Sequence, residues 1–194
     1  MKLFSSLYQK VLHWSKHKHA PAYLGMLSFA ESSFFPIPPD VMLAPMVLAK
    51  RERAWHYAAL TTITSVAGGL AGYLIGMFLF SEIGQPVIDM YQAQENFDQV
   101  KAWFDQYGIW VVFVAGFSPI PYKLFTITSG VLALAMLPFT LASLVGRGAR
   151  FFLVAGLLFW GGEKLEQFLH RRIDQIGWIM VGLVALAVVL LQFK

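Results

Sequence analysis

The chain contains no cysteine, and charged side chains make up only 13% of its 194 residues. Without thiols it can form no disulfide, no thiolate metal site and no thiol redox centre. A soluble domain carries about 25% charged residues, so this chain has too little polar surface to cover a globule in water. Hydrophobic residues reach 57%, and the mean hydropathy is +0.59. The composition therefore predicts an integral membrane protein with a single domain.

The first residues also lack an apolar core followed by a small-residue cleavage site, so we expect no signal peptide.

Lysine and arginine are unevenly distributed: four lie in 1–19, three in 50–53 and three in 164–172. The polar stretch 81–106 instead holds five acids and one basic residue, Lys101. Because basic loops remain on the cytoplasmic side, we expect a multi-pass protein with its N-terminus in the cytoplasm.

The single membrane domain is expected to span residues 1–194 in five segments. Residues 1–19 predict an amphipathic helix, which either lies on an anionic membrane surface or packs as an ordinary helix. The polar connector holds an apolar stripe that is typical of a helix at the membrane interface. The remaining segments are repeat 1 at 20–80, the connector at 81–106, repeat 2 at 107–163 and a C-terminal transmembrane helix at 176–193.

Three of the prolines in the apolar run 20–49 lie within four residues of one another and interrupt it. They are Pro36, Pro38 and Pro39. Proline removes a backbone donor and clashes with the preceding turn, so no straight helix passes through this stretch. The flanking arms, 20–35 and 41–49, would be about 24 and 14 Å long as helices, shorter than a hydrocarbon core of about 30 Å. Both ends of the run are basic, so we predict a re-entrant hairpin whose irregular tip lines a cavity or is covered by protein.

The Pro-Ile-Pro triplet of this tip recurs 83 positions later. The prolines of the second copy are Pro119 and Pro121. The same offset carries the hairpin 20–49 onto 103–132 and the apolar span 54–80 onto 137–163. The first unit starts inside and the second outside, and inverted repeats with discontinuous helices occur in secondary transporters. We therefore predict an all-α fold of two inverted units, each a re-entrant hairpin plus a transmembrane helix; chance recurrence of a short triplet is the alternative.

Glycines in the two long spans predict local features. Gly68, Gly72 and Gly76 lie four residues apart and would let another helix approach closely. The alternative is a glycine-rich helix without such a contact. In the later span, residues 146–150 contain two glycines and two arginines, and we expect them to break its helical character.

Five charged side chains fall at membrane depth. They are Glu31, Asp40, Lys123, Arg147 and Arg150. Charges in lipid are costly and usually mark a functional cavity. Glu31 suits a proton-coupling carboxylate or a cap for loose backbone groups at the tip. Asp40 suits coupling or the capping of the next helix.

The two arginines lie three residues apart and share a helical face. They suit either a phosphate cradle or salt bridges to the two acids. Under the 83-residue offset, Asp40 and Lys123 occupy equivalent positions at the two tips. An in-plane pseudo-two-fold axis brings equivalent tips together, so we also predict that these two side chains approach each other.

Residues 31–40 (ESSFFPIPPD), 116–123 (GFSPIPYK) and 146–150 (GRGAR) resemble, in this order, the DedA family of bacterial inner-membrane proteins. That family shares its fold with the eukaryotic VTT-domain lipid scramblases, in the superfamily of SNARE-associated Golgi proteins. The resemblance covers residues 20–163 and is strongest to the shorter YqaA-like branch. It implies an inner-membrane protein with hairpins that face each other.

The resemblance also implies a function. It implies a flippase or scramblase for undecaprenyl phosphate or a phospholipid, coupled to protons or sodium ions. Glu31 and Asp40 would then be coupling acids, and Lys123, Arg147 and Arg150 would contact the headgroup. Many family members carry arginines at the second tip, where this chain has Lys123. A lysine binds phosphate as a point charge, without the bidentate fork of arginine.

The sequence assigns no enzymatic chemistry. No serine–histidine pair is evident at membrane depth, and no histidine nucleophile lies near the two arginines in sequence. His13 and His17 have helical spacing, but no acid lies close enough in sequence to complete a metal site. We therefore expect no metal, no cofactor and no nucleic-acid partner. A non-transporting structural or assembly factor is the alternative function, followed by an intramembrane lipid-modifying enzyme.

Overall fold

The computed structural model is helical throughout the elements it describes. The described residues are 17–80, 82, 85–90, 92, 94–118 and 121–161. In chain order the elements are α2 (Ala20–Ser33), α3 (Asp40–Ala49), the short 3₁₀ helix η1 (Arg51–Arg53), α4 (Ala54–Phe78), α5 (Gln85–Met90), α6 (Gln94–Tyr107), α7 (Trp110–Phe117) and α8 (Tyr122–Val131). A long helix, Met136–Gly161, follows. The predicted helix at 176–193 and nearly all of the one at 1–19 lie outside the described residues.

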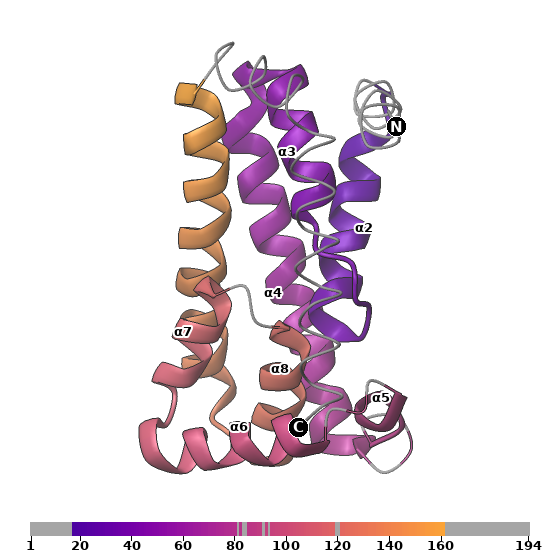
Figure 1. Ribbon diagram of the computed structural model, residues 1–194, viewed down its shortest axis with the longest axis vertical. Helices are drawn as coiled ribbons and strands as arrows, with labels where there is room; N and C mark the ends of the chain where they lie inside the picture. Colours follow the sequence, from indigo (N-terminus) through magenta and orange to yellow (C-terminus); the bar gives the residue numbers. More distant parts are fainter. Residues whose placement is uncertain are drawn as a thin grey trace, which may run out of the picture.

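Among the described residues, two helices are long and apolar enough to cross a membrane, η1 with α4 over Arg51–Phe78 and the Met136–Gly161 helix. Each has more than 25 residues, which corresponds to about 39–42 Å of helix. Figure 1 shows α4 and the orange Met136–Gly161 helix running along the length of the molecule. Both carry exposed large apolar side chains, such as Ile63 and Leu137, which suits a lipid environment.

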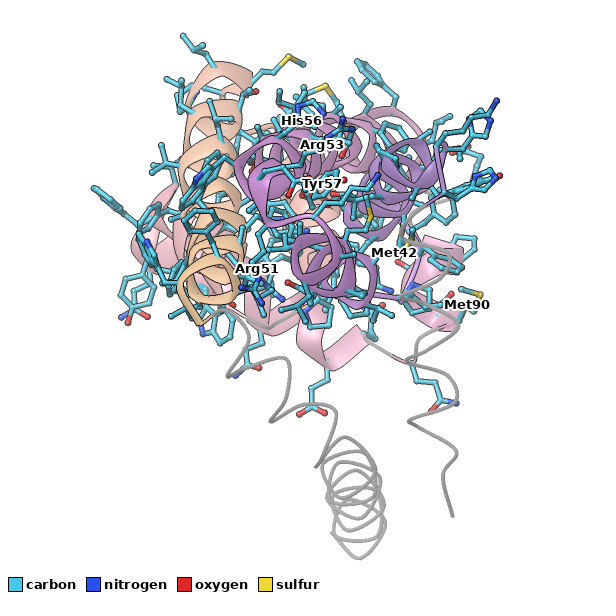
Figure 2. The ribbon with its side chains drawn as sticks, turned by 90° about the horizontal axis from the view of Figure 1, so that it is seen from above. Met42, Arg51, Arg53, His56, Tyr57 and Met90 are labelled. Atoms are coloured by element: carbon cyan, nitrogen blue, oxygen red, sulfur yellow. The ribbon has the colours of Figure 1, made fainter. Side chains whose placement is uncertain are left out.

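The short helices enter the bundle from opposite ends (Figure 1). The outer ends of α2 and α3 lie at the upper end, where Figure 2 labels Arg51 and Arg53 at the start of α4. The outer ends of α7 and α8 lie at the lower end, and α6 lies across that end. The two broken segments, α2 with α3 and α7 with α8, therefore reach toward the middle of the molecule from opposite ends.

Helix α4 packs between α2 and α8 through its glycines. A Cβ added at Gly68 would lie 2.1 Å from the backbone oxygen of Phe29 in α2, and one at Gly76 would lie 2.0 Å from that of Ile127 in α8. A Cβ added at Gly72, between them, would lie 2.4 Å from Thr126 Oγ1. The predicted close approach along this glycine stripe is confirmed.

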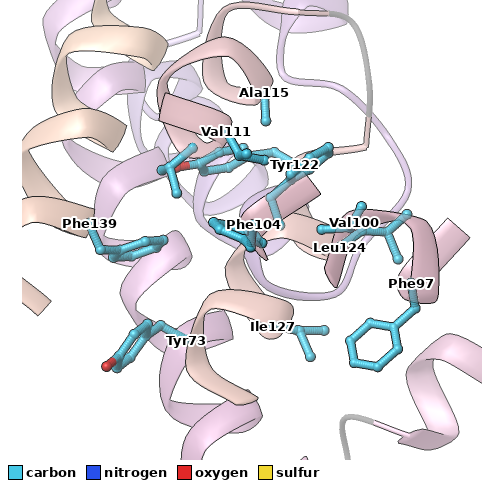
Figure 3. Packing of buried hydrophobic residues seen from close by; sticks show 12 residues of the cluster. Tyr73, Phe97, Val100, Phe104, Val111, Ala115, Tyr122, Leu124, Ile127 and Phe139 are labelled. Carbon is cyan, nitrogen blue, oxygen red and sulfur yellow. The ribbon is translucent and has the colours of Figure 1, made fainter. Parts of the chain in front are cut away.

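Within the part of the chain that the structure describes, two apolar clusters stabilise the bundle, one for each pair of short helices. The first joins α2, α3 and α4 to the Met136–Gly161 helix through residues such as Leu24, Leu43 and Phe151. The second joins α4 to α6, α7 and α8 (Figure 3), and α6 contributes its apolar stripe through Phe97 and Phe104. A helix is thus present in the connector as α6, with its apolar stripe buried against protein. Its position at the membrane interface stays a prediction.

The observed elements follow the 83-residue offset closely except at one point. Adding 83 to the bounds of α3 and α4 gives 123–132 and 137–161, and the structure has helices at Tyr122–Val131 and Met136–Gly161. Shifting α2 gives 103–116, but there α6 ends and α7 begins after a turn at Gly108, whose φ is +59°. Glycine readily adopts this left-handed conformation, so the partner of α2 is shortened to eight residues.

The expected interruption at residues 146–150 is wrong. The Met136–Gly161 helix continues through this stretch. A Cβ added at Gly146 would lie 2.5 Å from the backbone oxygen of Phe113, so this glycine serves the close packing of α7 on an unbroken helix. The structure also begins α3 at Asp40 and ends α2 at Ser33, within two residues of the expected arms.

Candidate functional site

The charged residues predicted from the sequence gather around the middle of the Met136–Gly161 helix. Four of them form two ion pairs, Arg147 with Glu31 and Arg150 with Asp40. Glu31 lies in the last turn of α2, whereas Asp40 is the first residue of α3. The structure therefore contains the salt bridges to both acids that were the alternative to a phosphate cradle.

Arg147 is enclosed by protein, with only 2% of its side chain exposed. Its Nη2 donates to a carboxylate oxygen of Glu31 and, at 3.3 Å, to Ser32 Oγ. Its Nε donates to Ser65 Oγ at 2.6 Å. The two serine hydroxyls lie 2.7 Å apart and share a hydrogen bond. Arg147 thus ties α2 to α4 through the helix that carries it.

Aromatic rings enclose the same guanidinium. Its central carbon lies 4.9 Å from the ring centroid of Tyr122 and 4.7 Å from that of Phe151, within the range of a cation–π interaction. The hydroxyl of Tyr122 donates to Ser143 Oγ, which lies one turn before Arg147. Hydrogen bonds and rings together leave Arg147 almost no contact with the surroundings of the protein.

Arg150 lies one helical turn further along and is more accessible. Its Nη2 donates to Asp40 Oδ2 at 2.7 Å, and its Nη1 donates to the backbone oxygen of Ser118 at 2.8 Å. The side chains of Arg150 and Asp40 are 20% and 25% exposed. Asp40 directly follows the first proline stretch and Ser118 directly precedes the second, so this one arginine joins both tips.

The capping alternative for Asp40 is not what the structure shows. Asp40 is a helical residue in the first turn of α3, and α3 has no side-chain cap hydrogen bond. Its carboxylate is instead directed to Arg150. The negative charge still suits the positive N-terminal end of a helix dipole.

Lys123 lies in the first turn of α8 and is buried, with 6% of the residue exposed. Glu31 interacts electrostatically with both Lys123 and Arg147. Two buried cations therefore share the field of one carboxylate. The structure pairs Asp40 with Arg150. The approach of Lys123 to Asp40 stays a prediction.

The tips themselves come together near these charges. The three prolines of the first tip lie in the non-helical segment between α2 and α3, and Pro121 directly precedes α8. Pro119 lies outside the described residues. Thr126 Oγ1 of α8 donates to the backbone oxygen of Ser32 in α2 at 3.2 Å, which joins the two broken segments directly.

Sequence reasoning missed several partners in this site. It assigned no role to Ser32, Ser65 or Tyr122, although all three contact Arg147 in the structure. Ser65 could have been recognised from the sequence. It lies in an apolar span three residues before a packing glycine, and a buried serine there needs a hydrogen-bond partner. The described part of the chain has no group of three metal-ligating side chains.

Comparisons with known proteins give one family model and several relatives. The VTT domain model matches residues 35–159, a range that includes four of the five charged residues and leaves out Glu31. A Haemophilus influenzae relative, itself described as uncharacterized, is 45% identical over 192 residues, covering 99% of this chain and all of the relative. A Histophilus somni relative with a similar description is 45% identical over 181 residues, or 93% of this chain and 94% of its own.

A third relative carries a functional name. The undecaprenyl phosphate transporter A of Staphylococcus aureus is 30% identical over 129 residues, which cover 64% of this chain and 58% of the transporter. No solved structure matches the chain significantly.

Proposed function

The chain belongs to the VTT domain family, and from that premise we propose that it moves a phosphate-bearing lipid across the membrane as a flippase or scramblase. The name of the Staphylococcus aureus relative supports a lipid phosphate as cargo. The observation that carries the proposal is the Arg150–Asp40 pair, which is partly exposed and joins both broken segments. Its accessible guanidinium is suited to bind a phosphate.

The arrangement of the short helices supports a transporter architecture. We propose that α2 with α3 and α7 with α8 are re-entrant hairpins of an inverted repeat, because their outer ends lie at opposite ends of the molecule (Figure 1). The match of two helix pairs within one residue under the 83-residue offset supports the same proposal. In such repeats the substrate binds near the midplane, at the interface between the repeats.

The proposed cycle begins with Arg150 bound to Asp40. An arriving phosphate displaces the carboxylate, because a phosphate oxygen pair matches the planar fork of arginine at least as well as a carboxylate does. Asp40 then loses its counter-charge and takes up a proton or a sodium ion. Release of the lipid on the other side restores the Arg150–Asp40 pair and expels the cation. Exchange of partners at Arg150 thereby couples lipid movement to an ion.

Arg147 has a different role in this proposal. Its guanidinium is too enclosed to contact a headgroup, so we assign Arg147 and Glu31 to positioning α2 against the helix that carries Arg150. Lys123 supplies a second buried positive charge that attracts the anionic headgroup toward the tips. Asp40 is the coupling acid, and Glu31 is a fixed counter-ion.

Reconstitution into liposomes tests the proposal. Purified protein is incorporated together with labelled polyprenyl phosphate, labelled phosphatidylglycerol or a labelled polyprenol without phosphate, each with and without a pH gradient. We expect faster movement of a phosphate-bearing lipid than in protein-free liposomes, acceleration by the gradient and no effect on the polyprenol. Equal rates with and without protein for every lipid would favour a structural or assembly factor.

A further inference from the structure

An apolar groove lies between α6, α7 and α8, with a volume of about 370 Å³. Its lining is almost wholly apolar and rich in aromatic rings. Buried side chains, including Ala115 and Phe125, form its floor, whereas Tyr107, Trp110 and Val114 are exposed at its rim. Trp103 of α6 stacks on Phe125 with ring centroids 6.1 Å apart, which holds one wall in place. The groove is thus a defined concave site whose mouth is open.

The groove leads toward the proposed headgroup site. Trp110 and Val114 of α7 line it, and Ser118 is the C-cap residue directly after the last residue of α7. Ser118 accepts the hydrogen bond of Arg150. From Trp110 to Ser118 the rise is about 12 Å. The body of α7 therefore lines the apolar groove, and its C-terminal end lies beside an accessible cation.

We propose that this groove binds the hydrocarbon chain of the lipid whose phosphate is held at Arg150. The inference rests on the proposed function for the identity of the headgroup. An amphiphile with an anionic head and an apolar chain matches the order of surfaces along α7, a cation at one end and an apolar groove at the other. A peptide segment would bring backbone groups that an apolar groove leaves without hydrogen bonds.

The groove also accounts for exposed apolar residues at its rim. Trp110 and Val114 are 69% and 60% exposed, although they flank a concave site. Pockets that bind apolar ligands are lined by such side chains, with few polar groups to orient the ligand. Here the orienting group lies outside the groove, at Arg150. The bound hydrocarbon chain would direct the lipid along α7, which lies at the end of the bundle opposite to the start of α4.

Photo-crosslinking in the full-length protein tests this assignment. Benzoylphenylalanine replaces Val114 at the groove or Val145, a matched control residue of the same type that is 56% exposed on the Met136–Gly161 helix and does not line the groove. The protein is embedded in nanodiscs with radiolabelled polyprenyl phosphate. We expect several times more labelled adduct from position 114 than from position 145, and competition by unlabelled polyprenyl phosphate. Arg150→Gln should reduce the adduct at 114 alone.

Two outcomes overturn the groove assignment. Equal labelling at positions 114 and 145 would mean only general contact with bilayer lipid. A crosslink from 114 to another segment of the same chain would mean that the protein itself fills the groove. Because binding is measured without transport, the two proposals fail separately. Selective labelling without lipid movement in liposomes would refute the function and keep the groove, and movement with equal labelling would do the reverse.

A second variant adds a functional readout. Val114→Trp places a large ring over the groove, and we expect slower lipid movement with an unchanged melting temperature. Val145→Trp should move lipid at the wild-type rate. Equal rates for the two folded variants would contradict a chain-binding role for the groove.

Discussion

Arg147 and Arg150 lie three residues apart on one helix, and each is paired with an acid from the first broken segment, yet their surroundings differ. The side chain of Arg147 is 2% exposed and that of Arg150 is 20% exposed. Arg147 has two serine hydroxyls and two aromatic rings in addition to its carboxylate. Arg150 has one carboxylate and one backbone oxygen.

We propose that this difference separates a structural arginine from one that binds the substrate. Breaking a buried ion pair leaves an uncompensated charge, so the enclosed arginine cannot exchange its partner without a large loss of stability. A partly exposed pair is held together weakly, because solvent and mobile ions compete with it. Only the second arrangement allows a phosphate to replace a carboxylate. The variants below test this division.

Removal of the enclosed arginine is expected to have the largest effect. Arg147→Met should lower the free energy of unfolding by about 3–5 kcal/mol, because Glu31 loses its direct ion pair inside the protein. The measurement is the melting temperature in detergent together with the amount of protein in the membrane.

A double variant sharpens this prediction. Glu31→Gln combined with Arg147→Met removes both charges, so it should recover much of the stability that the single change loses. A single variant as stable as the wild type would contradict the structural role of Arg147.

Next in size is a change beside the same arginine. Gly146→Ala would place a methyl group 2.5 Å from the backbone oxygen of Phe113, so α7 must move away, at a cost of about 1–3 kcal/mol. Movement of α7 also displaces Ser118 from Arg150. Gly148→Ala is the control, because its methyl would meet only the side chain of Thr62 at an ordinary 3.5 Å. Equal melting temperatures for the two variants would argue against close packing at Gly146.

Loss of one hydrogen bond to the enclosed arginine should have a smaller effect. Ser65→Ala removes the acceptor of Arg147 Nε, and we expect a loss of about 1–2 kcal/mol with lipid movement retained. Thermal unfolding and the liposome assay give the two readouts. A Ser65→Ala protein of wild-type stability that moves no lipid would place Ser65 in the transport pathway instead.

The smallest effect on stability is expected at the accessible pair. Asp40→Asn should change the free energy of unfolding by less than about 1 kcal/mol. Lipid movement should persist but lose its response to a pH gradient, because asparagine cannot exchange a proton. A full response to the gradient in this variant would exclude Asp40 as the coupling acid.

Much of the fold was predictable because its signals are local. The prolines at 36–39 predicted where α2 ends and α3 begins, and apolar length predicted both long helices. The four-residue spacing of the glycines predicted the packing of α4, which the structure confirms. The comparisons confirm the family at the level of the VTT domain, while assignment to the YqaA-like branch stays a prediction.

The site was predictable only as a set of residues. Sequence spacing put Arg147 and Arg150 on one helical face, but it could not say which of them is enclosed. That depends on rings and hydroxyls contributed by α4 and α8, which are distant in sequence. The shortening of α7 was missed although its signal is local. Gly108 allows a turn, but the 83-residue offset predicted an unbroken arm there.

The central claim is that the accessible Arg150 holds a lipid phosphate. Its most direct test is the rate of labelled polyprenyl phosphate movement in liposomes that contain Arg150→Gln protein of verified melting temperature. The account predicts a folded protein that moves this lipid no faster than protein-free liposomes do. Movement at the wild-type rate by a well-folded Arg150→Gln protein would contradict it.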